Sequence, residues 1–189
     1  RNVFDAVNAW ALAGGWLTIN YMAGRRLYVD SVTVPSSADL WNWTEEFTIT
    51  FRAYAVPYWE QETANTQTFG GSVSSASRAI QVDGSAATQA DVELQNTSGM
   101  TIQNATVSIG GKAMTFTNLG LGGSEALVID HADGLLRIRI RSGSSYRSAM
   151  AMRTVTSAND FMIAPGSRDC SYSANRACRM TVSWRARYL

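Results

Sequence analysis

The sequence predicts a mainly β protein whose second half is an antiparallel β-sandwich. From residue 79 onward, short segments alternate between apolar and polar residues. Glycine pairs and Asp-Gly or Ser-Gly steps separate these segments, and the 189 residues contain fifteen Gly but only three Pro. Alternation has the period of a half-buried strand, and Gly-rich turns join antiparallel neighbours. Six or more such segments are typical of a two-layer sandwich.

The first part of the chain is expected to begin with a helix over residues 1–14. Apolar side chains there recur at helical spacing, and Gly14-Gly15 is a plausible stop. Strands are expected over 16–22, 26–34 and 47–55. The third is the clearest, because alternate residues share an apolar face: Phe47, Ile49, Phe51, Ala53 and Ala55.

A polar stretch from residue 61 to 77 marks the expected domain boundary, because it holds little apolar content and a Gly pair. This places a first domain at 1–66 and a second at 67–189. Strands of the second domain are expected over 79–82, 91–96, 105–109, 113–117, 125–131, 135–141, 160–163 and 178–189. Asp133-Gly134 between two of them is a strong hairpin signal.

Charge is distributed very unevenly. Ten of the sixteen basic residues lie after residue 133 beside two acids, whereas residues 70–133 hold two basic residues and six acids. All but Lys112 are arginines, which pair carboxylates through a planar fork. Outward arginines on late strands repel one another unless acids or phosphates face them. We therefore expect head-to-tail assembly in which five arginines face a partner's carboxylates: Arg137, Arg139, Arg141, Arg185 and Arg187.

The cysteines and acids predict no cofactor. Cys170 and Cys178 could close a disulfide if adjacent strands bring their Cα atoms within about 7 Å. Free thiols in a reducing cytoplasm are the alternative. Two Cys and one His cannot supply the usual four-ligand zinc site, and the acids lack calcium-loop spacing, so no metal site is predicted.

Catalysis, membrane insertion and nucleic-acid binding are not predicted. His131 follows Asp130 on one strand, so their side chains point to opposite faces, and we expect a strand-end histidine near the surface. No nucleophile or phosphate-cradling motif is visible. No apolar run approaches bilayer length, and the basic end lacks a recognition helix. The chain opens at Arg1 without Met or leader, which suggests a fragment or processed chain.

Several stretches resemble the distal tail protein (Dit) family of long-tailed bacteriophages. The stretch Gly120-Leu121-Gly122-Gly123-Ser124-Glu125 with its following strand, the segment 159–166 and the ending 179–189 are similar to that family's second domain. Trp10 in a short helix, residues 26–29 and residues 47–59 resemble the end of its amino-terminal tail-ring domain. The chain starts late relative to the family, which normally begins with a fuller amino-terminal sandwich.

The resemblance implies a galectin-like carboxy-terminal sandwich and a non-enzymatic structural subunit of the virion. Such a subunit forms a ring, of six copies by analogy, that joins tail tube to adsorption apparatus at the distal end of the tail. Its partners are neighbouring tail-tube and tail-tip proteins, and assembly takes place in the bacterial cytoplasm. Trp41 and Trp43, at alternate positions in a loop-like stretch, are expected to contact a partner protein.

Two alternatives remain at this stage. A carbohydrate-binding module that recognises a cell-surface polysaccharide is the first, because a galectin-like fold and six Trp invite a saccharide ligand. Most of the Trp lie in alternating or helical apolar patterns, which favours packing. A hydrolase that uses His131 is the second.

Overall fold

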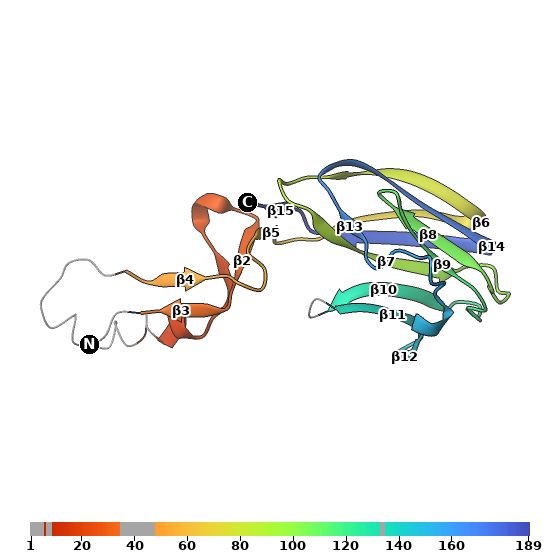
Figure 1. Cartoon of the computed structure of the whole chain (residues 1–189), viewed down its shortest axis with the longest axis horizontal. Coiled ribbons are helices and arrows are strands. Elements are labelled where there is room, and N and C mark those ends of the chain that lie inside the picture. The colour runs from red at the N-terminus through yellow and green to blue at the C-terminus, as the bar shows by residue number, and fades with distance from the viewer. Residues whose placement is uncertain (1–5, 7–8, 35–47, 133–134) are drawn as a thin grey trace, which may run out of the picture. The chain divides into compact units, whose positions relative to one another are not determined.

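A computed structural model describes residues 6, 9–34, 48–132 and 135–189. The chain divides into two compact units, Arg1–Glu62 with Arg187–Leu189 and Thr63–Ala186. Both are built from antiparallel strands (Figure 1). The mainly β fold class is therefore confirmed.

The first unit contains two small sheets. Its elements are β1 (Gly15–Thr18), the 3-10 helix η1 (Asn20–Met22), β2 (Arg25–Val29), β3 (Ser31–Thr33), β4 (Thr50–Arg52), β5 (Trp59–Gln61) and β15 (Arg187–Tyr188). One sheet has the order β1-β2-β5-β15, and β3 pairs with β4. Residues 6 and 9–12 are helical, and the rest of the expected helix up to residue 8 lies outside the described residues.

Two strands expected in this unit are interrupted. The segment 26–34 divides into β2 and β3 at Asp30, whose carboxylate accepts the backbone N–H groups of Tyr54 at 2.6 Å and Ala55 at 2.9 Å. The chain bends there because a carboxylate that accepts two backbone donors holds a turn. The expected final strand 178–189 also divides, and its last part, β15, pairs with β5 of the first unit.

The second unit is one strongly curled sheet. Its elements are β6 (Asn65–Val82), β7 (Thr88–Asn96), β8 (Ala105–Ile109), β9 (Lys112–Phe116), β10 (Ala126–Ala132), β11 (Leu135–Ser142), β12 (Ser145–Ser148), η2 (Met150–Met152), β13 (Met162–Ile163) and β14 (Gly166–Trp184). The order is β12-β11-β10-β7-β14-β8-β9, with β6 beside β14 and β13 beside β7. Ala132 pairs with Leu135, which confirms the hairpin whose two turn residues lie outside the described residues.

The polar stretch 61–77, where the sequence places the domain boundary, includes the division between the two compact units at Glu62 and Thr63, but it is not an unstructured connection. Most of it forms β6, which pairs with β14 from Asn65↔Trp184 to Val82↔Gly166. Segment 166–177, for which no strand is predicted, is likewise part of β14. The alternation pattern does not reveal β6, because this strand has exposed Ser, Thr and Gly in place of an apolar face.

A bulge in β14 joins the two halves of the curled sheet. Before it, Cys170 pairs with Ile109 of β8; after it, Cys178 pairs with Asn96 of β7. The Tyr172 hydroxyl secures the bulge, lying 2.5 Å from the Cys178 carbonyl oxygen. A Cβ atom at Gly70 would lie 2.1 Å from that hydroxyl, so glycine is required there.

The inner face of the sheet encloses one hydrophobic core. Fully buried side chains come from both ends of the strand order, including Met114 and Phe116 of β9 and Ile138 and Ile140 of β11. Because these residues belong to a single cluster, the ends of the sheet wrap around the same interior. The predicted sandwich thus forms by curling of a sheet whose layers share β6 and β14 (Figure 1).

Candidate interaction surfaces

The outer side of β11 carries the arginines singled out by the sequence. Arg137, Arg139 and Arg141 alternate with buried core residues and are each partly exposed. We call these three residues, with Asp130 of β10 and Glu93 of β7, the arginine face.

Carboxylates of the same chain face this arginine row. Arg139 is hydrogen-bonded to Asp130 through Nη2, and Arg141 Nη2 lies 2.5 Å from Glu93 Oε1. The guanidinium carbon of Arg139 also lies 4.6 Å from the centre of the Tyr146 ring. Acids therefore offset the repulsion between neighbouring arginines, as the sequence argument requires.

Strand register brings the two charged segments together. Val128 of β10 lies opposite both Glu93 of β7 and Arg139 of β11. The acidic stretch that precedes residue 133 and the arginine-rich stretch that follows it are thus adjacent in the same sheet. The strong charge separation along the sequence is largely neutralised in space. Because the pairs are 22–38% exposed, each contributes at most about 1 kcal/mol.

The other sequence-predicted partner residues are scattered. Arg187 belongs to the first unit, where its Nε lies 2.9 Å from Oε1 of the nearly buried Glu60. Arg185 follows β14, is partly buried and makes a contact of its own. Trp41 and Trp43 lie outside the described residues.

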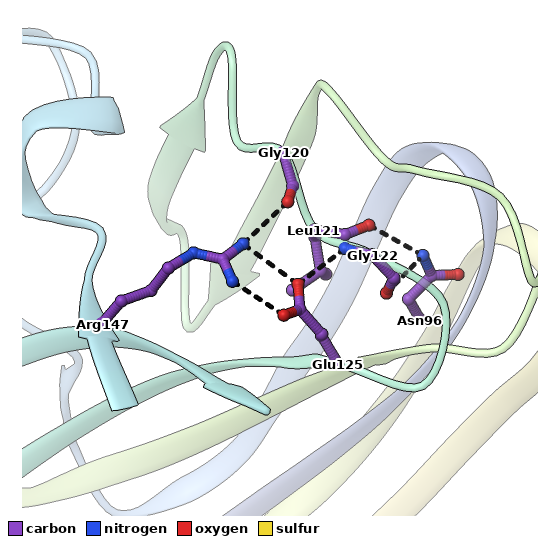
Figure 2. A network of polar contacts seen from close by, with 6 residues as sticks. All are labelled: Asn96, Gly120, Leu121, Gly122, Glu125 and Arg147. Atoms are coloured by element: carbon purple, nitrogen blue, oxygen red, sulfur yellow. Dashed lines mark hydrogen bonds and ion pairs between the residues drawn. The ribbon is translucent and has the colours of Figure 1, made fainter. Parts of the chain in front are cut away.

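The glycine-rich stretch that carries the family resemblance forms a polar clamp (Figure 2). Arg147 donates to Glu125 at 2.7 and 3.0 Å and to the Gly120 carbonyl at 2.7 Å, and Glu125 accepts the Gly122 N–H at 2.7 Å. The hydrogen bond from Arg147 holds the pKa of Glu125 below its usual range. Residues 120–125 are therefore fixed against the strand β12.

Asn96 holds the same loop from the opposite side. Its buried amide donates to the carbonyl oxygens of Leu121 at 2.9 Å and Gly122 at 3.0 Å (Figure 2). It also donates to the Met100 carbonyl at 2.7 Å, and its Oδ1 accepts the Ser98 N–H at 2.9 Å. The glycine-rich stretch 120–125 therefore forms a loop that Asn96 holds on one side and Arg147 on the other. Sequence reasoning missed Asn96 because an isolated Asn carries no pattern.

His131 is not a surface histidine, so that expectation is wrong. Its side chain is 3% exposed, its Nδ1 lies 3.4 Å from Asp91 Oδ1, and its backbone N–H donates to the same oxygen at 3.1 Å. Its other ring nitrogen, Nε2, is buried without a hydrogen-bond partner among the described residues. These contacts tie the end of β10 to β7.

Of the two alternatives for the cysteines, the structure has the free thiols and not the disulfide. Cys170 and Cys178 are free, buried thiols on the same strand, β14. Extended residues advance about 3.3 Å each, so eight positions separate the two Cα atoms far beyond the disulfide range even with a bulge. Burial raises the pKa of both thiols to about 11. Among the described residues, no group of three metal-ligating side chains occurs.

The surface of the first unit is rich in aromatic rings. Trp10, Tyr21 and Tyr54 are 62%, 84% and 65% exposed, whereas Ala11 and Val29 are the only buried apolar residues in the described part of this unit. A shallow cleft is lined by Trp10, Ala11, Gly14, Gly15, Trp16, Leu17, Val29 and Phe51. A unit with so small an interior and so many exposed rings has the properties of a protein interface.

In the described part of the second unit, the exposed aromatic ring is that of Tyr146, which is 51% exposed and stacks with Arg139. Trp184 is the only Trp between residues 63 and 186, and it is 7% exposed. In the described part of the chain, no helix is both long and apolar enough to cross a bilayer. These surfaces belong to two units that are both built mainly from β-strands.

Comparisons with solved structures identify the fold more closely. The SPP1 Dit (gp 19.1) protein, described as a paradigm of the hub adsorption apparatus in phages that infect Gram-positive bacteria, matches with a TM-score of 0.65 and 13% identity, over 98% of this chain and 70% of its own. The phage P2 baseplate in its activated conformation with Ca contains a chain that matches with a TM-score of 0.50 and 10% identity, over 98% and 73%.

No family model matches the sequence, and no curated protein is significantly similar to it. At these identities the structural matches establish the fold. The chain has the fold of a phage distal tail protein, and the resemblance predicted from the sequence is confirmed at that level.

Proposed function

We propose that this chain is a structural, non-enzymatic subunit of a phage tail tip. The observation that carries the proposal is the TM-score of 0.65 with the SPP1 hub protein over 98% of the chain. In this role the chain forms a ring, of six copies by analogy, at the distal end of the tail. The ring joins the tail tube to the adsorption apparatus.

The first unit forms the ring contacts in this proposal. Its exposed rings and sparse interior would bury further apolar area against a neighbouring copy, at about 25 cal/mol per Å². Contacts around a closed ring are heterologous, so the two contacting edges of each subunit differ. Trp41 and Trp43 contribute to this contact.

The second unit serves as a docking surface for other tail proteins. Each guanidinium has five N–H donors, and the hydrogen bonds of Arg139 to Asp130 and of Arg141 to Glu93 each use one of them. The arginine face can therefore bind carboxylates of a partner without losing its internal pairs. Arg137 and Arg185 of the second unit, and Arg187 of the first unit, complete the proposed set of partner-facing charges.

Native mass and negative-stain images of the purified chain test the proposal. We expect closed rings with about six times the mass of one chain, by family analogy. Replacing the exposed Tyr21 by Glu should shift the particles towards monomers, whereas the fully exposed Val155→Glu on the second unit should leave them intact. A monomer at every concentration, with both units folded, contradicts the ring.

A carbohydrate-binding role is the competing proposal. The buried Trp184 and the covered His131 argue against a galectin-type sugar site on the second unit. A glycan array with the intact chain distinguishes the two proposals. Saccharide binding at millimolar or lower concentration that is lost on replacing Trp10 would favour the sugar module.

A further inference from the structure

The strand β6 presents a long open edge. One of its sides pairs with β14 except at residues 71, 72 and 74, where the register shifts at the bulge, and no described strand pairs with its other side. No backbone hydrogen bond outside the β14 ladder involves residues 66–82 among those described. Residues 72–75 and 77–79 are exposed. Such an edge offers unpaired N–H and C=O groups to an added strand.

Two arginines without partners flank the central part of this edge. Arg78 lies on β6, and Arg179 of β14 lies opposite Gly70. Both are exposed, and neither has a hydrogen bond or ion pair with a described residue. A Cβ on Gly71 would lie 3.7 Å from Arg179 Nε, so this side chain extends over β6.

The stretch between the two arginines is uncharged and small. It reads Gly-Ser-Val-Ser-Ser-Ala-Ser from residue 71 to 77. The only acid in β14, Asp169, lies opposite Ala79 and therefore on the other face of the ladder from Arg78. The two charges lie on opposite faces of the sheet, because Arg78 pairs with the core residue Cys170 whereas Arg179 stands between the core residues Cys178 and Met180. The carbonyls of Gly71 and Val73 already accept the Thr97 and Tyr172 hydroxyls, so the main-chain groups open to an added strand are the remaining ones, with a positive charge near each end about 25 Å apart at the usual strand rise.

We propose that this edge binds an extended, acidic segment of a partner polypeptide as an additional strand. Main-chain hydrogen bonds to β6 would supply most of the affinity, and carboxylates near both ends of the segment would pair with Arg78 and Arg179. This site is independent of the ring proposed above, since it lies wholly in the second unit.

A second copy of the chain fits this edge poorly. Pairing of two β6 edges would bring four unpaired guanidinium groups together without an acid between them. Arg78 also shares the face of Ile80 and Ala76, and an inward charge on an edge strand is a recognised guard against pairing between copies. The charge pattern therefore favours an acidic partner.

Binding of a labelled peptide to the full chain tests the proposal. The probe has eight residues, with glutamate at both ends and alternating threonine and valine between them, so that its two glutamates point to opposite faces as Arg78 and Arg179 do. A second peptide has lysine in place of glutamate. We expect saturable binding of the glutamate peptide below about 1 mM that weakens with added salt, and at least about tenfold weaker binding of the lysine peptide. Hydrogen exchange should slow at residues 72–79 when the first peptide is bound.

Matched arginine variants locate the site. The double variant Arg78→Glu with Arg179→Glu should bind the glutamate peptide at least about tenfold more weakly, because two attractive pairs become repulsive. Arg176→Glu is the control. Arg176 is exposed and unpaired among the described residues, but its bulge is bonded towards residues 97 and 104, away from β6. The Arg176→Glu variant should bind the glutamate peptide with an affinity within about twofold of wild type.

Several outcomes would overturn the proposal. These are equal affinity for both peptides, equal losses in the control and the double variant, or protection away from β6. A concentration-dependent protection of β6 without peptide would assign the edge to a second copy instead. A peptide with N-methyl groups at alternate residues, which cannot form the edge hydrogen bonds, should not bind; if it binds as well as the first, strand addition is wrong. Ring formation is measured separately by particle mass.

Discussion

Replacing Asn96 by Ala should destabilise the second unit more than any change on its polar surface. The Asn96 side chain is 1% exposed and donates to three backbone carbonyls between 2.7 and 3.0 Å. One of these belongs to Leu121, a fully buried residue. Truncation removes these donors, and the Leu121 and Gly122 carbonyls then keep only their backbone bonds, from the Ile102 N–H at 2.9 Å and the Glu125 N–H at 3.2 Å.

The magnitude follows from the number of bonds lost. Each net hydrogen bond contributes about 1 kcal/mol, and the substitution removes the bonds made by the two amide N–H groups and the bond that the Asn96 oxygen accepts from the Ser98 N–H. The expected loss for Asn96→Ala is therefore about 3 kcal/mol. For a domain of this size, that loss lowers the melting temperature by about 10 °C.

Urea denaturation followed by tryptophan fluorescence, to which the buried Trp184 contributes, measures the loss of unfolding free energy. Equal dependence of that free energy on urea concentration in the variant and the wild type checks that both unfold in two states. Asn96→Asp is the matched variant, since it keeps the acceptor for Ser98 but removes the donors. It should lose most of the same free energy. Gln95→Ala, on the outer side of β7, should stay within about 0.5 kcal/mol. If the unfolding free energy of Asn96→Ala also stays within about 0.5 kcal/mol of wild type, the Asn96 hydrogen bonds do not hold the loop.

Three further predictions concern the same unit. Because the pKa of Glu125 is lowered, its pairing with Arg147 stabilises the fold at any pH above the ordinary glutamate pKa, and this stabilisation is lost as the pH falls through the lowered pKa. The difference in unfolding free energy between wild type and Arg147→Met, measured by urea titration, should therefore shrink between pH 7 and strongly acidic pH. The two buried thiols, with pKa values of about 11, should react with a dithiodipyridine reagent only slowly at pH 8 and rapidly in urea, and fast reaction of the folded chain would contradict their burial. Gly70→Ala should lower the free energy of unfolding by about 3 kcal/mol, since it combines a positive φ with displacement of the Tyr172 hydroxyl. The control Gly143→Ala, at a positive φ in open space, should lower it by about 1 kcal/mol. Equal melting temperatures of the two variants would exclude the clash at Gly70.

Much of the sandwich could be predicted from local pattern. The strands β8, β9, β10 and β11 fall where alternation places them, because each has one face in the core and one in solvent. The hairpin between β10 and β11 follows from Asp-Gly turn chemistry. The row of arginines on β11 was visible for the same reason, since its three positions alternate with buried isoleucines.

Long polar strands could not be predicted in this way. Residues 65–77 of β6 have no apolar alternation, and they are extended because β14, about a hundred residues later in the chain, pairs with them on both sides of its bulge. Sequence alone likewise could not distinguish a disulfide from two thiols on one strand, since that depends on whether Cys170 and Cys178 lie on adjacent strands or on the same one.

By itself, the sequence determined the class of fold, the alternation of core and surface, and the identity of the charged residues, because these depend on neighbours within a few positions. Tertiary structure decided which charges meet. It placed Glu93 and Asp130 beside the arginines of β11, and it left Arg78 and Arg179 unpaired at an open edge among the described residues. Electrostatic interaction depends on distance in space, and strand register sets that distance between residues far apart in the chain.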